Sequence, residues 1–411
     1  MLLFFFALAA LQTTGGTDRP TSPRDTPTGD VVVTGIRLDD SAAAHKSCIE
    51  RHCPPGQDIA ATLAHAENLF VAGDYHAARQ TLGRAIGRDK RFAASYPVPV
   101  SQLLRANANV ALHLGESDGY RIGTIDVVAA LKAGLPGDDP RIMAAQVEVG
   151  DSFARVGRFD AAISAYRGVE RHAHDRGLSI LEGHARLRIA VLYVALALEA
   201  PQDYGADARR AIGAITDSSD AKLANFVLAA KVLRARLASK AGDASAIDHL
   251  VADFRGSVGT TPVLLYSPSI RLPERAFRTA DAQLVGTDAN SLIAISSGSE
   301  LARRASYDFE GQWVDVGFWV SPNGKVSDPA VLRQSAHLAG DWVRPIMTAV
   351  SARRYATLAL DPADPGIFRV ERYSFTSFWE SDKTGTHLRT RSTTPRIEIL
   401  DLSIDPAPPK S

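Results

Sequence analysis

The densest group of side chains that could do chemistry lies between His45 and Cys53. Within nine residues it holds two histidines and the chain's only two cysteines, in the order His-x2-Cys-x3-His-Cys. In an oxidising compartment, two cysteines separated by four residues typically close a small disulfide loop. Zinc ligands are usually spread over two structural elements, and this run is one short segment. We therefore predict a disulfide between Cys48 and Cys53, with free thiols or a metal site as the alternatives.

Other histidines give no catalytic pattern. His172 and His174 lie among arginines and are expected on a solvated helix end, and His337 is expected in a surface loop. The chain contains no G-x-S-x-G, H-E-x-x-H, P-loop or G-x-G-x-x-G motif. We predict no catalytic residue, no cofactor, no bound metal and no enzymatic activity. A site assembled from distant residues would leave no motif, so an uncharacterised periplasmic enzyme stays open as an alternative.

The length of the chain allows two or three domains, and its charge balance indicates no electrostatic partner. The chain has 411 residues, and its 46 Lys and Arg residues equal its 46 Asp and Glu residues in number. Capture of nucleic acid or of an anionic membrane would favour a basic excess. Nucleic acid is therefore not an expected partner.

The first residues resemble an export signal. Leu2 to Leu11 is apolar throughout. Ten helical residues span about 15 Å, half of a bilayer core of about 30 Å, so this segment is too short to cross a membrane. We predict a signal peptide at 1–16 and a periplasmic location. The apolar run from Leu187 to Leu198 is also short and contains an arginine, which indicates a buried helix.

Residues 58–256 are rich in Ala, Leu and Arg and show an internal repeat. Gly73, Gly115 and Gly157 recur at intervals of 42 residues, and fainter copies follow at Gln202 and Gly242. Segments such as Gly-Asp-Tyr with flanking small residues resemble tetratricopeptide repeats, although that family's period is 34. The repeat predicts five helix pairs stacked into an α-solenoid with a concave face; an irregular helical bundle is the alternative.

Residues 306–404 contain signals for a small mixed domain. From Gln312 to Val320 the apolar side chains alternate, as in a half-buried strand. Asn323-Gly324 is a strong hairpin turn, and Lys325 to Gln334 follows as the returning strand. A helical pattern ends at Val350, and an aromatic strand runs from Gly366 to Trp379. The predicted order is strand, strand, helix, strand, with a further edge strand between Leu388 and Ile404.

This domain resembles the C-terminal domain of TonB-type energy transducers. The resemblance covers roughly 70 residues and rests on the Val-x-Val-x-Phe-x-Val strand, the Asn-Gly-Lys-Val turn, the helix and the Gly-x-Phe-Arg strand. It implies binding of the short box of outer-membrane receptors by strand addition. The chain departs from the family because it lacks a spanning helix and a Pro-rich spacer. On the strand from Gly366 to Phe378, we predict Arg372, Tyr373 and Phe375 as partner contacts.

A second candidate binding segment precedes the helices. Val31, Val32 and Val33 have high strand propensity, and with Thr34 and Gly35 they resemble a segment near the mature N-terminus of TonB-dependent receptors. The segment is predicted to pair with a sheet edge in the same chain or in another one. A first strand packed on the chain's own fold is the alternative.

These observations predict an α+β multidomain protein, an α-solenoid of helix pairs followed by a small α+β domain. The expected function is non-catalytic protein binding in the Gram-negative envelope, with TonB-dependent receptors or TonB-system components as the partners that the resemblance implies. A repeat scaffold whose C-terminal domain is only structural is the main alternative. The predicted divisions are a signal peptide (1–16), a disordered linker with the valine segment and cysteine loop (17–57), the solenoid (58–256), a linker or insertion (257–305), the α+β domain (306–404) and a tail (405–411).

Overall fold

The computed structural model describes residues 37–243, 245–254, 261–272, 309, 311–381, 389–392 and 394–403. Most of these residues are helical, and a separate group of antiparallel strands follows the helices, so the predicted α+β class is confirmed. The predicted signal peptide, the valine segment at 31–33 and the tail lie outside the described residues. Among the described helices, none combines the length and the apolar character needed to cross a bilayer.

The helices from α2 to α11 stand in pairs, as predicted from the 42-residue interval. Glycines in the left-handed region occupy four of the turns within pairs: φ is +90° at Gly73, +76° at Gly115, +77° at Gly157 and +106° at Gly242. The fourth pair turns at Ala200, just before the predicted Gln202. The pairs in the described chain are α2 (Pro55–Ala72) with α3 (Tyr75–Asp89), α4 (Pro97–His113) with α5 (Ser117–Gly134), α6 (Pro140–Arg155) with α7 (Phe159–Asp175), α8 (Ser179–Glu199) with α9 (Pro201–Thr216), and α10 (Ala224–Lys240) with α11 (Ala246–Asp253).

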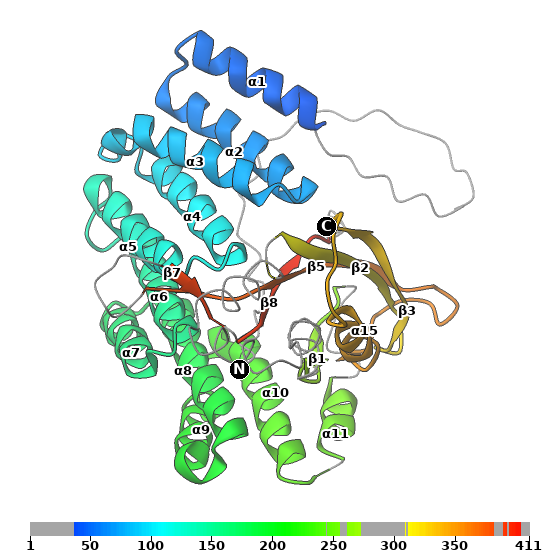
Figure 1. Cartoon of the computed structure of the whole chain (residues 1–411). Coiled ribbons are helices and arrows are strands. Elements are labelled where there is room, and N and C mark those ends of the chain that lie inside the picture. The colour runs from blue at the N-terminus through cyan, green and yellow to red at the C-terminus, as the bar shows by residue number, and fades with distance from the viewer. Residues whose placement is uncertain are drawn as a thin grey trace, which may run out of the picture.

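Small residues let the paired helices approach closely. A Cβ at Gly150 would lie 2.4 Å from the ring of Tyr166, and one at Gly123 would lie 2.7 Å from the Cβ of Ala108. Such separations are shorter than any van der Waals contact, so a larger side chain would push the helices apart. Figure 1 shows the pairs following one another in an arc, with the strands beside its inner edge.

A helix, α1 (Leu38–Glu50), precedes the pairs, where the sequence analysis placed part of a disordered linker. That prediction was wrong for these residues. The two large aliphatic side chains of the segment, Leu38 and Ile49, are exposed, but it buries Ser41 and Cys48 against α2. The rings of His45 and His65 stack with centroids 5.3 Å apart. Cys48 and the following Cys53 lie at disulfide-bonding distance, with Cα atoms 5.2 Å apart, as predicted.

The main sheet has four antiparallel strands in the order β3-β2-β5-β8. The predicted order of strand, strand, helix and strand is confirmed, and β8 adds the expected strand near the C-terminal end. The elements are β2 (Gln312–Val320), β3 (Val326–Gln334), α15 (Val343–Ser351), β5 (Ile367–Thr376) and β8 (Arg396–Asp401), with the short pairs β1 (Leu264–Tyr266) with β4 (Arg354–Tyr355) and β6 (Trp379–Ser381) with β7 (Arg389–Arg391).

The sheet is covered on both faces. On one face, apolar residues of β2 and β5 pack with Trp342, Ile346 and Val350 from the α15 region. On the other face lie Trp313 and Asp315, which are buried against the helix pairs. The strand β2 was predicted to be half-buried; it is buried on both sides because the helices cover the face that alternation alone assigns to solvent.

A second contact joins the far end of the helical arc to the strands. Leu265 of β1 packs with Val232, Leu250 and Phe254 from the last helix pair. Residues 264–266, within the segment predicted as a linker or insertion, therefore form a strand packed on the last helix pair. The two ends of the arc both hold the sheet region.

Candidate functional site

The contact between the sheet and the helix ends centres on a buried ion pair. Arg372 of β5 donates to Asp315 of β2, with Nε at 2.7 Å from Oδ1 and Nη2 at 2.9 Å from Oδ2. Both side chains are fully buried. The two residues are cross-strand partners, so sheet register alone brings them together. A second arginine, Arg333 of β3, lies 2.7 Å from the same carboxylate.

The same guanidinium binds the end of a helix. Nη1 of Arg372 donates to the carbonyl of Phe70 at 2.6 Å, and Nη2 donates to that of Val71 at 2.8 Å. These carbonyls belong to the last turn of α2, where the helix dipole favours a cation. The carbonyl of Phe70 also accepts the N–H of the capping Gly73 at 2.9 Å. The ring of Trp313 lies 3.9 Å from the guanidinium carbon, in a cation–π contact.

A similar contact repeats at the next helix pair. Nη2 of Arg391 lies 3.4 Å from the carbonyl of Leu114, which follows α4, and its Nη1 donates to the carbonyl of Ser377 at 3.2 Å. The N–H of Trp379 donates to the carbonyl of Gly115 at 3.0 Å. Arginines from the sheet region thus approach the carboxyl ends of α2 and α4 in turn.

The glycines of the helix turns make room for these contacts. A Cβ at Gly73 would lie 2.3 Å from Nε1 of Trp313, and one at Gly115 would lie 2.0 Å from the carbonyl oxygen of Ser377. A glycine there meets two requirements at once, a positive φ and close approach of another segment. Two of the repeat glycines, Gly73 and Gly115, are therefore also places where the sheet region touches the helix pairs, whereas Gly157 and Gly242 face open space.

A chain of polar side chains crosses the contact beside the ion pair. The hydroxyl of Ser374 lies 2.8 Å from the Tyr75 hydroxyl and 2.9 Å from Nδ1 of His113. Burial lowers the pKa of His113 to about 4; Glu398 opposes this shift and Arg155 and Arg372 add to it. The imidazole is thus neutral at neutral pH.

A serine hydroxyl beside a neutral imidazole is the arrangement of a nucleophile and its base. Ser374, however, is 1% exposed, and the pair is closed between the sheet and the helices. A substrate would reach the hydroxyl only if the two parts separated. In this arrangement the pair works as a hydrogen-bonded link.

A second buried ion pair ties the third helix pair to β8. Nη1 of Arg155, at the end of α6, donates to Oε2 of Glu398 at 2.7 Å, and both side chains are buried. Beside it, the Phe378 ring packs in an apolar cluster with Leu112 and Tyr120. The sheet therefore contacts the ends of three successive helix pairs.

The structure corrects the prediction that β5 offers a free edge. It pairs with β2 along one side and with β8 along the other. Arg372 faces the helices, whereas Tyr373 and Phe375 belong to the core on the α15 side, and all three are buried. The fourth strand, β8 of the same chain, occupies the edge that was expected to be open.

An exposed edge exists at the other side of the sheet. Among the described residues, β3 pairs only with β2. Val331 and Leu332 are 37% and 48% exposed. The register is irregular near Asp328, whose φ is +48°, and Pro329 follows it. A second register shift lies between Val331 and Arg333, so the stretch at residues 330–334 carries one further irregularity, at Leu332.

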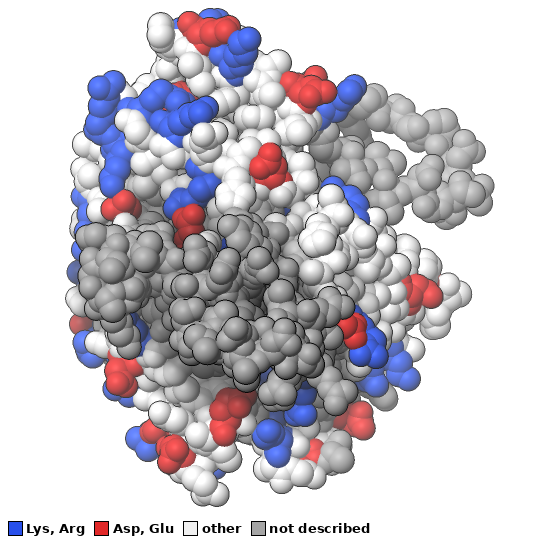
Figure 2. Space-filling model, viewed as in Figure 1, with Lys and Arg blue, Asp and Glu red and all other residues white. Residues whose placement is uncertain are grey.

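The remaining predicted positions behave as surface residues. His172 and His174 are exposed near the end of α7, and His337 is exposed in the segment after β3. Within the described ranges, no group of three or more His, Cys, Asp or Glu side chains is arranged to hold a metal ion. On the face shown in Figure 2, basic and acidic side chains are interspersed.

Asp315, Ser374 and His113 were not among the predicted functional residues. A signal for one of them was present: Asp315 stands in the centre of a strongly apolar strand, where an unpaired carboxylate would be costly. Comparison of the chain with protein-family models, with curated proteins and with solved structures finds no match.

Proposed function

We propose that this chain is a non-catalytic protein-binding protein of the cell envelope. In this proposal the helix pairs hold the sheet rigidly, and the sheet binds an extended segment of a partner protein along β3. The observation that carries the proposal is the edge position of β3, because an unpaired strand edge presents backbone donors and acceptors to an added strand.

The chemistry of β3 favours a short added strand. Pro329 has no N–H to donate, and the irregular register near Asp328 turns the backbone away from a straight ladder. Strand addition is thus limited to about residues 330–334, where a second register shift between Val331 and Arg333 shortens the added ladder further. There the exposed Val331 and Leu332 offer apolar contacts to a partner's side chains.

The family resemblances of the helix pairs and of the sheet domain extend this proposal. We take the helix pairs as tetratricopeptide-like and the sheet domain as similar to that of TonB-type transducers, with TonB-dependent receptors or TonB-system components as partners. Support for a periplasmic location comes from the Cys48–Cys53 pair, since disulfides persist in oxidising compartments. The segment at 31–33 is a candidate for the added strand, in the same chain or from another copy.

A second candidate function rests on the buried contact between sheet and helices. Because Arg372 and Glu398 bind helix residues, the sheet could serve only to lock the helix pairs, which would then present the binding surface. Exposed apolar side chains on the outer helices, such as Ile122 of α5 at 52% exposure, would be contacts in that case.

Matched substitutions separate the two functions. Leu332→Asp places a charge on the β3 surface, and Ile122→Asp places the same charge on α5. Both positions are exposed, so neither change should lower stability by more than about 0.5 kcal/mol. With affinity-tagged full-length protein in envelope extracts, we expect Leu332→Asp to lose the proteins that co-purify and Ile122→Asp to retain them. Loss with Ile122→Asp alone would favour the scaffold function and contradict strand addition.

A further inference from the structure

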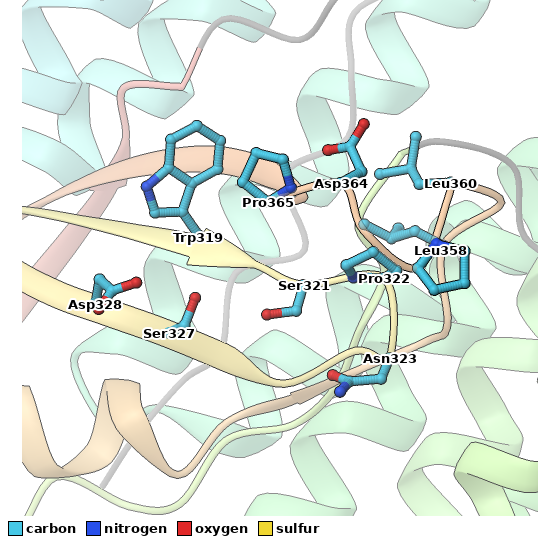
Figure 3. Close-up of a pocket in the computed structure, with 11 residues that line it drawn as sticks. Trp319, Ser321, Pro322, Asn323, Ser327, Asp328, Leu358, Leu360, Asp364 and Pro365 are labelled. Carbon is cyan, nitrogen blue, oxygen red and sulfur yellow. The ribbon is translucent and has the colours of Figure 1, made fainter. Parts of the chain in front are cut away.

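A pocket lies beside the turn that joins β2 to β3, with a volume of about 720 Å³. Figure 3 shows its two sides: the hairpin supplies Trp319, Pro322 and Asp328, and the loop before β5 supplies Leu358 and Asp364. Asp328 lies on β3 itself, two residues before the stretch at 330–334. The pocket is therefore continuous with the exposed strand edge.

The walls of the pocket are held in place by backbone hydrogen bonds. The N–H of Leu358 donates to the carbonyl of Pro322 at 2.9 Å, and that of Tyr355 donates to Gly324 at 2.8 Å, so the loop is fixed to the hairpin. The ring of Trp319 packs against Phe368 with centroids 5.1 Å apart. A preformed pocket loses little conformational entropy when a ligand binds.

The charge of the pocket is negative. Its lining residues include two carboxylates, Asp328 and Asp364, and no lysine or arginine. Neither carboxylate forms an ion pair with a described residue, whereas Asp315, Glu371 and Glu398 of the same sheet all pair with arginines. Asp364 accepts a hydrogen bond from the N–H of Gly366 at 2.8 Å, which orients its carboxylate.

An aromatic ring next to unpaired carboxylates is complementary to a cation on an apolar stem. Lysine and arginine have such side chains, and their charge is attracted to both the indole ring and the carboxylates. We infer that the pocket binds a lysine or arginine side chain of the segment that adds to β3, with its stem on Trp319 and Leu358 and its charge attracted by Asp328 and Asp364, which line opposite sides of the pocket. This inference rests on the proposed function for the source of the cation.

The test uses three synthetic probes with full-length protein. One is a seven-residue peptide of alternating Thr and Val with arginine at its centre, and the second replaces this arginine by citrulline, which has the same shape without the charge. The third is N-acetyl-arginine N-methylamide, which is too short to add a strand. Binding is followed by fluorine NMR of protein labelled with 5-fluorotryptophan, in which four tryptophans give signals. Trp319→Phe assigns the relevant one.

We expect the arginine peptide to shift the Trp319 signal and to bind about tenfold more tightly than the citrulline peptide, since exposed ion pairs and a cation–π contact are each weak. Asp328→Asn and Asp364→Asn should each reduce this preference by about threefold. Asp361→Asn, in the same loop but outside the pocket lining, is the control and should leave it unchanged.

The outcomes distinguish the pocket from strand addition. Equal binding of the two peptides, or equal effects of the control and pocket substitutions, would overturn the cation site and leave strand addition standing. If the arginine amide shifts the Trp319 signal while the peptide binds no more tightly than the amide, the cation site is supported and strand addition fails. If no probe shifts that signal, the cation site is wrong.

Discussion

Replacing Arg372 by methionine tests how strongly the sheet is held to the helices. The change keeps an unbranched side chain of similar length and removes the charge. It leaves Asp315 buried with only Arg333 beside it, and it removes the donors to the carbonyls of Phe70 and Val71. The perturbation therefore acts on the ion pair and on the helix end together.

The expected magnitude follows from these losses. Removing one partner of a buried ion pair lowers the free energy of unfolding by about 3–5 kcal/mol, because the remaining charge is uncompensated. Arg333 reduces this cost, since it still binds the carboxylate, although it is half exposed. The carbonyl of Val71 loses the donor from Arg372 and adds about 1 kcal/mol or more if it stays buried. The carbonyl of Phe70 keeps the N–H of Gly73. We expect the free energy of unfolding to fall by about 3–5 kcal/mol.

Urea unfolding followed by tryptophan fluorescence measures this change. Trp313 lies against the guanidinium, so its emission should report separation of the sheet from the helices. Arg333→Met is the matched control and should cost less than about 1 kcal/mol. The double variant with Asp315→Leu should lose less than the sum of the single changes, because it leaves no unpaired charge. A loss below 1 kcal/mol for Arg372→Met would refute the assignment of Arg372 as the link.

Two further predictions concern the same contact. Gly73→Ala should lower the free energy of unfolding by at least about 2 kcal/mol, because the alanine would adopt a positive φ and its Cβ would clash with Trp313. Gly157→Ala is the control: its φ is similar but the space around it is open, so it should lower the free energy of unfolding by about 1 kcal/mol. For His113, burial lowers the pKa from 6.5 to about 4. Between pH 6.5 and pH 4 the imidazole is therefore protonated in the unfolded chain and neutral in the folded one, so the free energy of unfolding falls as the pH decreases through this window. The loss should approach about 3 kcal/mol near pH 4 relative to pH 7. Unfolding curves for His113→Asn should show a weaker pH dependence, and an unchanged dependence would contradict the burial of a neutral imidazole.

The helix pairs and the hairpin could be predicted because their signals are local. The glycines at 73, 115 and 157 mark turns at a fixed interval, and Asn323-Gly324 specifies a turn within a few residues. Strand alternation also separated the two faces of β2 correctly. Alternation does not indicate which element of the protein packs against each face.

The contact between sheet and helices could not be predicted in the same way. Arg372 and its helix carbonyls lie about 300 positions apart in the chain, so no spacing rule connects them. Arg372 was predicted as a partner contact because a strand at a sheet edge and a buried strand have the same apolar pattern. The helix α1 was not predicted because its two large aliphatic residues, Leu38 and Ile49, do not form a buried face and its contacts depend on α2.

Amide hydrogen exchange of the full-length protein tests most directly whether a partner segment adds to β3. In the free protein, β5 should exchange slowly because it is paired on both sides, and residues 330–334 should exchange faster. On addition of the arginine peptide described above, we expect slower exchange at residues 330–334 and no change in β5 or at the end of α2. Slower exchange confined to β5 or to the helix pairs, with residues 330–334 unaffected, would contradict strand addition at this edge.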